Sequence, residues 1–362
     1  MSTIVTAADA AHLLRLVPHL LDYTPTQSLV VIPLRSGRSL GVMRVDLPPD
    51  DADLDAVAST VVGLACRVAG VEGFVAVVYT DESAGPALPG ADLIGALRRT
   101  ARACGLDLVD ALTVAADGWG SHLEPTLPRG GHPLALIGHR TLASDQSSGA
   151  DLPLVDASEV AGASAALTSL ESALTVLCGI PSTLGAEARI DPAALQAACA
   201  LDDLPALYEE MLEWDAAALD PMRVAVLGWC LSRPSLRDVA IVQWSGDQDR
   251  GDDALDAQRR WEDGEEYPVD LAEVLWGEGP RPDPERLLRA LELVRQVAAR
   301  LPADERAGAC ATAGWLAWAL GRSTHAGRYA AAALEVDPRL GLAEILMSFV
   351  QSSHLPDWAF RR

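Results

Sequence analysis

Two arginine–aspartate pairs have the residue types and spacing best suited to ligand chemistry. Arg44 and Asp46 alternate in RVDLP, so their side chains face the same side of a predicted strand. Arg237 and Asp238 directly precede the apolar run VAIVQW in the second half of the chain. A guanidinium binds a carboxylate through charge-assisted hydrogen bonds. Each pair therefore predicts either a structural ion pair between domains or the polar wall of a ligand-binding cleft.

A second group of candidate ligand-binding residues follows predicted strands. Asp81 and Glu82 come directly after the apolar run GFVAVVYT, and Asp117 and Trp119 follow the run LDLVDALTVAA. Ligands of open α/β sheets sit at the carboxyl ends of the strands. We therefore expect these side chains near a binding site.

Familiar catalytic and metal signatures are weak or absent. Ser39 lies in GRSLG, which matches the serine hydrolase pattern, but its flanks predict two strands and hence a hairpin tip rather than a nucleophile elbow. His122, His132 and His139 share one segment, at spacings that match no known zinc site. The chain contains no lysine, which excludes an ordinary P-loop. We expect no cofactor, no metal site and no catalytic residue that the sequence alone identifies.

The elements that must position the candidates change in character near residue 150. In residues 1–150 a helical opening precedes two β-branched runs around a Ser-Gly-Arg-Ser turn, which is typical of a β-hairpin. Alternating helical and strand-like segments follow. This half predicts an α/β domain with a mixed sheet, a β-hairpin and flanking helices.

Residues 151–362 predict an all-helical domain, because strand-like runs disappear and amphipathic segments follow one another. A polar, acidic connection between residues 245 and 270 predicts a surface loop or a short solvated helix. The helical segments are expected at 158–177, 192–200, 203–217, 222–232, 234–243, 285–300, 305–320, 323–335 and 339–350.

The segment GWLAWALGRSTHAGRYAAAALEVDPRLGLA repeats small residues at intervals that suit two closely packed helices. Gly314 and Ala326 are twelve residues apart, Ala333 follows seven later, and Pro338 five after that. This spacing resembles one tetratricopeptide repeat, a helical hairpin of about 34 residues. The resemblance implies a unit at about 306–338 with a capping helix at about 339–350. A peptide-binding array needs about three such units, so one unit favours a packing role.

Composition limits the classes of partner. The 362 residues carry a formal net charge of −23, from 51 acidic residues against 28 arginines. An acidic surface repels phosphate backbones, so we expect no nucleic-acid partner. We also expect no membrane span and no signal peptide, and hence a cytoplasmic protein. The six cysteines stand in apolar contexts and are predicted as buried free thiols: Cys66, Cys104, Cys178, Cys199, Cys230 and Cys310.

Over nearly its whole length the chain resembles an uncharacterised actinobacterial family, a domain of unknown function. The matching segments are LVPHLLDYTPTQSLVVIPL, MRVDLP, DGWGS, LRDVAIVQW and the C-terminal hairpin. The resemblance implies an actinobacterial source and adds Ser121 to the candidate ligand-binding residues. It also places Arg44, Asp46, Trp119, Arg237 and Asp238 on characteristic motifs of the family. The family's cysteines after the tryptophan motif are absent here.

The sequence leaves the function unknown and favours binding over catalysis. We expect a small ligand at a cleft between the two halves or a protein partner, and a homo-oligomer stays open. The alternative is a hydrolase that uses Asp46, Asp81 or Asp238 beside Arg44. A third class, a helical interaction module, predicts an exposed apolar groove near Trp315 and Trp318.

Overall fold

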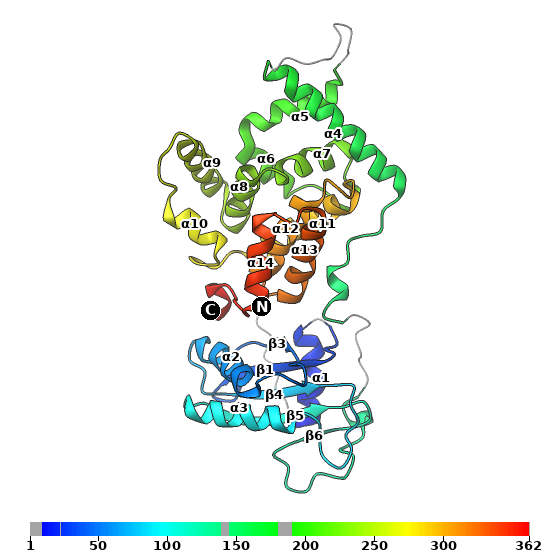
Figure 1. Ribbon diagram of the computed structural model, residues 1–362, viewed down its shortest axis with the longest axis vertical. Coiled ribbons are helices and arrows are strands. Elements are labelled where there is room, and N and C mark those ends of the chain that lie inside the picture. Colours follow the sequence, from blue (N-terminus) through cyan, green and yellow to red (C-terminus); the bar gives the residue numbers. More distant parts are fainter. Residues whose placement is uncertain (1–8, 22, 139–144, 180–189, 362) are drawn as a thin grey trace. The chain divides into compact units, whose positions relative to one another are not determined.

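The computed structural model describes residues 9–21, 23–138, 145–179 and 190–361, which form two compact units (Figure 1). The sheet unit comprises Met1–Gly149 together with Phe360–Arg362, and the helical unit comprises Ala150–Ala359. A mixed sheet with helices is therefore followed by an all-helical region, which confirms the predicted fold class.

The sheet unit contains one mixed sheet in the order β2-β1-β4-β5-β6, with β3 paired to the same edge of β1 as β2. Only β4 and β5 run parallel, and the other pairs are antiparallel. The predicted hairpin is confirmed. Its second arm is divided into β2 and β3, which both pair antiparallel with β1. The strands are β1 (Ser28–Arg35), β2 (Arg38–Ser39), β3 (Met43–Asp46), β4 (Gly73–Tyr79), β5 (Asp107–Val114) and β6 (Trp119–Ser121).

Each face of the sheet is covered by helices, because successive side chains of a strand point to opposite faces. Helix α1 (Ala10–Leu21) covers one face, where Leu14 and Val17 pack on Val30 and Ile32 of β1. Helices α2 (Leu54–Arg67) and α3 (Ala91–Ala103) cover the other face (Figure 1). The fully buried strand β4 therefore lies between two apolar layers.

The helical unit begins several of its helices at Asp-Pro dipeptides. Proline suits the first helical turn, and the preceding aspartate accepts hydrogen bonds from free N–H groups there. Helices α5, α7 and α11 start in this way. The helices are α4 (Ala157–Leu177), α5 (Pro192–Ala200), α6 (Leu204–Met211), α7 (Pro221–Leu231), α8 (Pro234–Ser245), α9 (Gln248–Glu262), α10 (Val269–Leu275), α11 (Pro284–Arg300), α12 (Ala307–Ala319), α13 (Ser323–Val336) and α14 (Gly341–Gln351).

The segment 245–270, predicted as a surface loop or a short solvated helix, is helical over most of its length. It contains α9, a helix of 15 residues, and the beginning of α10. Helix α9 buries only small residues, Gly251, Ala254 and Ala257, against its neighbours. A Cβ atom at Gly251 would lie 2.1 Å from the side-chain oxygen of Gln243. The Gln243 side chain therefore packs where only a glycine fits, and the fully buried residues of α9 form no large apolar stripe in the sequence.

The C-terminal hairpin of α12 and α13 packs as its small residues predict. A Cβ atom at Gly314 would lie 3.3 Å from the carbonyl oxygen of Ala326 and 3.1 Å from Leu346 of α14. The predicted apolar groove near Trp315 and Trp318 is wrong, since both indoles are fully buried. These large rings fill the core between helices, so they offer no docking surface.

Helix α4 has the length and mean hydropathy of a membrane-spanning helix, and it is the one such helix in the described part of the chain. It begins with a capping box formed by Asp156 and Glu159. Glu159 also accepts a hydrogen bond from the buried Arg300 of α11 at 3.0 Å. Leu170 and Ala173 of α4 belong to the main apolar core of the unit. These contacts are those of a helix within a folded domain.

All six cysteines are free, but the prediction that they are buried holds for only two of them. Cys230 and Cys310 lie in the core of the helical unit. The prediction failed for the other four cysteines, because they stand at or near helix ends, where apolar neighbours in the sequence do not ensure burial. These are Cys66, Cys104, Cys178 and Cys199.

Candidate functional site

Strand register brings one group of predicted site residues to the same edge of the sheet unit. Ser28 at the start of β1 pairs with Asp46 at the end of β3 on one side and with Tyr79 at the end of β4 on the other. Asp81 follows Tyr79 by two residues and accepts a hydrogen bond from the side chain of Gln27 at 3.3 Å. Asp46 and Asp81 therefore lie at one end of the sheet.

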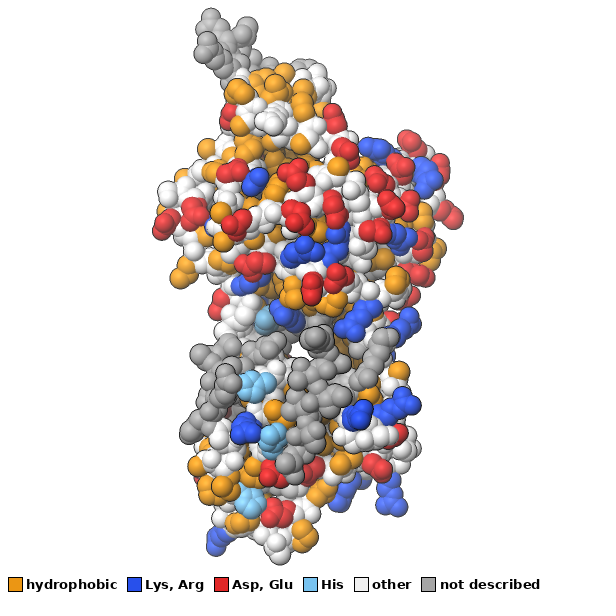
Figure 2. Space-filling view, turned by 180° about the vertical axis from the view of Figure 1, so that it is seen from behind, with side chains coloured by type: hydrophobic (Ala, Val, Ile, Leu, Met, Phe, Trp, Pro, Cys, Tyr) orange, Lys and Arg blue, Asp and Glu red, His pale blue; other side chains and the backbone are white. Residues whose placement is uncertain are grey.

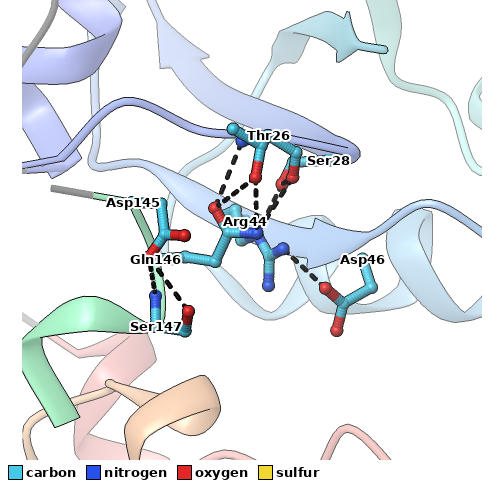
Figure 3. Close-up of polar contacts among 7 residues, drawn as sticks. All are labelled: Thr26, Ser28, Arg44, Asp46, Asp145, Gln146 and Ser147. Atoms are coloured by element: carbon cyan, nitrogen blue, oxygen red, sulfur yellow. Dashed lines mark hydrogen bonds and ion pairs between the residues drawn. The ribbon is translucent and has the colours of Figure 1, made fainter. Parts of the chain in front are cut away.

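Arg44 is held in place from both sides of its guanidinium (Figure 3). Its Nε donates to Ser28 Oγ at 2.7 Å, and its Nη2 donates to Asp46 Oδ1 at 2.5 Å. The Arg44 side chain is only 5% exposed, whereas that of Asp46 is 80% exposed. Burial raises the pKa of the nearby Tyr23, while the charge of Arg44 acts in the opposite direction. The first predicted pair is therefore an ion pair within the sheet unit.

The remaining predicted residues of the sheet unit make structural contacts around β5 and β6. The N–H of Ala84 donates to Asp117 Oδ1 at 2.7 Å. Trp119 is buried on the α1 face, and its Nε1 donates to the Pro133 carbonyl at 3.2 Å. Ser121 Oγ donates to Asp110 Oδ1 at 2.5 Å. The Asp117 contact joins the loops after β4 and β5, and the Ser121 contact joins β6 to β5.

The histidines of the sheet unit make separate contacts rather than one metal shell. His122 Nε2 lies 2.8 Å from Thr113 Oγ1, and His132 Nε2 lies 2.9 Å from Glu124 Oε2. His139 lies outside the described residues. Across the described ranges, no three His, Cys, Asp or Glu side chains are placed to hold a metal ion. Ser39, in strand β2 of the hairpin, donates to the Gly41 carbonyl at 2.8 Å.

A polar clasp that the sequence did not reveal ties residues 145–148 to the start of β1 (Figure 3). The amide of Gln146 accepts from the Thr26 N–H at 3.2 Å and donates to the Thr26 carbonyl at 3.0 Å. Backbone N–H groups of Ser147 and Ser148 lower the pKa of Asp145 to about 2. The clasp anchors the chain shortly before the helical unit begins.

The second predicted pair lies at the start of α8 in the helical unit. Arg237 Nε donates to Asp238 Oδ1 at 2.9 Å, and Arg237 Nη2 lies 2.8 Å from the same oxygen. Arg237 is buried, whereas the Asp238 side chain is 32% exposed. Burial raises the pKa of Asp238, and the charge of Arg237 lowers it in part.

Asp238 lines a cavity of about 450 Å³ formed by helices α8, α9 and α10. Burial and the neighbouring Asp238 charge raise the pKa of Tyr267, which lies on its wall. Trp261, at the end of α9, keeps 54% of its surface exposed. The walls combine carboxylates, two aromatic rings and apolar side chains: Pro234, Ser235, Asp238, Gln258, Trp261, Glu262, Tyr267, Ala272 and Leu275.

Sequence reasoning found Asp238 but missed the other walls of this cavity. Trp261 and Tyr267 stand in the segment predicted as a polar connection. The only signal in the sequence was the presence of two aromatic residues within an otherwise acidic segment. Only the packing of α9 and α10 on α8 brings them to Asp238. The predicted cleft between the two halves stays a prediction.

Comparison with known proteins gives a family without an activity. No curated protein and no solved structure matches the chain. A family model described as a domain of unknown function, DUF4192, matches residues 11–263 and 281–357. These ranges include both ion pairs and most of the cavity. The chain therefore belongs to the DUF4192 family.

Proposed function

We propose that the protein is a binding protein that holds a small cationic ligand in the cavity of the helical unit. The observation that carries the proposal is the position of the Asp238 carboxylate. Arg237 bonds only its Oδ1 atom, and no donor among the described residues reaches Oδ2 within hydrogen-bonding distance. A partly buried carboxylate oxygen without a donor favours a ligand that brings one.

The aromatic walls of the cavity support a positively charged ligand. A cation over the face of tryptophan or tyrosine is attracted by the ring's negative electrostatic face. Trp261 and Tyr267 supply such rings, and Glu262 adds a second carboxylate. Acidic side chains are also spread over the face of the helical unit seen in Figure 2. Ammonium and guanidinium compounds fit this chemistry.

Apolar walls and the volume of the cavity define the rest of the ligand. Pro234, Ala272 and Leu275 supply apolar surface beside the charged groups. A volume of about 450 Å³ suits a small molecule rather than a folded partner. The proposed ligand is therefore an amine or guanidine that carries a short aliphatic chain.

Two of the three carboxylates named in the hydrolase alternative, Asp46 and Asp81, are engaged within the sheet unit, which favours binding. Asp46 is bonded to Arg44 and Asp81 to Gln27. Ser28 Oγ, which contacts Arg44, donates its proton to the Thr26 carbonyl. The proposal also keeps the expected cytoplasmic location, which six free cysteines support. The predicted protein partner and homo-oligomer stay predictions.

Calorimetric titration tests the proposal with agmatine and putrescine, and with glycerol and urea as uncharged comparisons. We expect saturable binding of the two cations alone. Asp238→Asn should weaken binding about 10- to 150-fold, since a hydrogen bond to a charged group contributes about 1.5–3 kcal/mol. Trp261→Ala should weaken it about 2- to 30-fold through loss of the cation–π contact. Equal binding of the uncharged compounds would contradict the proposal.

Trp276→Ala is the matched control for the Trp261 substitution. Trp276 is similarly exposed, at 50%, and is not among the residues that line the cavity. Its replacement should leave the affinity for agmatine unchanged. Asp238→Asn can lower the stability of the fold because Arg237 loses its charged partner. Trp261→Ala leaves that pair intact, so a loss of affinity in both variants identifies the cavity.

A further inference from the structure

Two exposed cysteines stand at equivalent places in the sheet unit. Cys66 is in the last turn of α2, and Cys104 directly follows α3. Both lie on the helix-covered face opposite α1. They are 38 positions apart in the chain, so the sequence alone does not pair them.

The topology of the sheet brings the two cysteines together. Helix α2 leads into β4 and helix α3 leads into β5. These strands are parallel neighbours, and Gly73 of β4 is in register with Asp107 of β5. The carboxyl ends of both helices therefore lie at the same end of the sheet. Val61 and Val62 of α2 share an apolar cluster with Leu97 of α3, and Figure 1 shows the two helices next to each other.

The two thiols lie near each other, because Cys104 is among the groups that raise the pKa of the Cys66 thiol. Together with the packing of α2 on α3, this makes the two residues candidates for a disulfide. Cys104 has left the regular helix, and Gly105 after it has φ +74°.

We propose that Cys66 and Cys104 are a redox-active thiol pair that peroxide converts into an intramolecular disulfide between α2 and α3. One thiolate sulfur attacks a peroxide oxygen, the O–O bond breaks, and a sulfenic acid and one water form. The second thiol attacks that sulfur, the S–O bond breaks, and a second water leaves. Two electrons pass from the thiols to the peroxide, and the thiol protons end in water. A dithiol reductant reverses the change.

The surroundings of Cys66 set the reactivity of the pair. Burial, followed by the effect of Cys104, raises the pKa of the Cys66 thiol. The thiolate is the attacking form, so a raised pKa slows the reaction at neutral pH. The pair is therefore a slowly oxidised, reversible cross-link rather than a peroxide-consuming centre.

Peptide mapping of the intact protein tests this inference. Treatment with hydrogen peroxide should remove two of the six free thiols and lower the mass of the intact protein by about 2 Da. The remaining free thiols are then blocked before digestion. Trypsin should release residues 45–67 and 103–129 as one disulfide-linked product. Dithiothreitol should separate the two peptides and restore both thiols. The melting temperature of the oxidised protein should rise, because the cross-link restricts the unfolded chain.

Serine substitutions show whether the reaction is specific to this pair. Cys66→Ser and Cys104→Ser should each abolish the linked product and the rise in melting temperature. Cys178→Ser and Cys199→Ser remove the other two exposed thiols and should leave both unchanged. A disulfide between two copies of the chain would overturn the inference. Overoxidation of Cys66 to a sulfinic acid without any linked peptide would do the same.

Discussion

Gly277→Ala should strongly destabilise the helical unit, since two separate penalties meet at this residue. Gly277 ends α10 with φ +83°. Its N–H donates to the Val274 carbonyl at 3.1 Å, and the N–H of Glu278 donates to the Glu273 carbonyl at 3.0 Å. This is the Schellman arrangement, which needs a left-handed residue after the helix. Alanine in that conformation loses about 1–2 kcal/mol relative to glycine.

The second penalty is steric. A Cβ atom at Gly277 would lie 2.5 Å from the ring carbon Cη2 of Trp318 and 2.7 Å from the Cα of Pro356. Trp318 is fully buried, and its Nε1 donates to the His354 carbonyl at 2.8 Å, so the indole cannot retreat without losing that bond. Overpacking of a core typically destabilises by about 1–3 kcal/mol. The two penalties together predict a loss of about 2–5 kcal/mol.

Gly279→Ala is the matched control, because this residue has φ +98° in the same loop and open space where a Cβ would stand. We expect it to lose only the conformational penalty of about 1–2 kcal/mol. Urea unfolding followed by circular dichroism at 222 nm measures both losses in the transition of the helical unit. The effect of alanine on the unfolded chain is common to both variants and cancels in the comparison. Equal losses would refute the steric argument.

Two further substitutions test contacts in each unit. Asp53→Ala should destabilise the sheet unit by about 0.5–2 kcal/mol, because Asp53 Oδ1 caps α2 through two N–H groups. Thermal unfolding measures this loss, and an unchanged melting temperature would contradict the capping role. Glu209→Gln should remove pH-dependent stability, since hydrogen bonds from Arg286 lower the pKa of Glu209. The wild-type advantage should be present above the unfolded-state pKa and disappear as pH falls through the folded-state pKa, as measured by urea midpoints. The exposed pair of Glu213 and Arg289 is the control. Glu213→Gln should change the urea midpoint little over the same pH range.

The elements of the sheet unit were predictable because their signals are local. The β-branched runs around residues 28–48 become β1 and β3, and the apolar run at residues 73–79 becomes the fully buried β4. Helix starts were also local, since Asp-Pro dipeptides combine a capping side chain with a favourable first turn. Helix α9 was predicted only as one of two alternatives, because its fully buried residues are all small: Gly251, Ala254 and Ala257.

The candidate site could be predicted only in part. The sequence singled out Asp238 from a local feature, the pairing of opposite charges before an apolar run. Trp261 and Tyr267 joined it only when α9 and α10 packed on α8, and no short-range pattern encodes that packing. The buried positions of Trp315 and Trp318 likewise depend on neighbours from distant segments.

The sequence by itself determined a helix-flanked sheet followed by a helical region, because backbone preferences and apolar periodicity act over a few residues. It also singled out the two Arg–Asp pairs, whose members are adjacent or two residues apart, and the structure decided that each forms an ion pair within one unit. Tertiary structure alone decided which cysteines meet and which aromatic rings face a carboxylate. Those contacts join residues 38 positions apart for Cys66 and Cys104, and 23 apart for Asp238 and Trp261. Strand register and helix packing bring them together, and both are properties of the assembled fold.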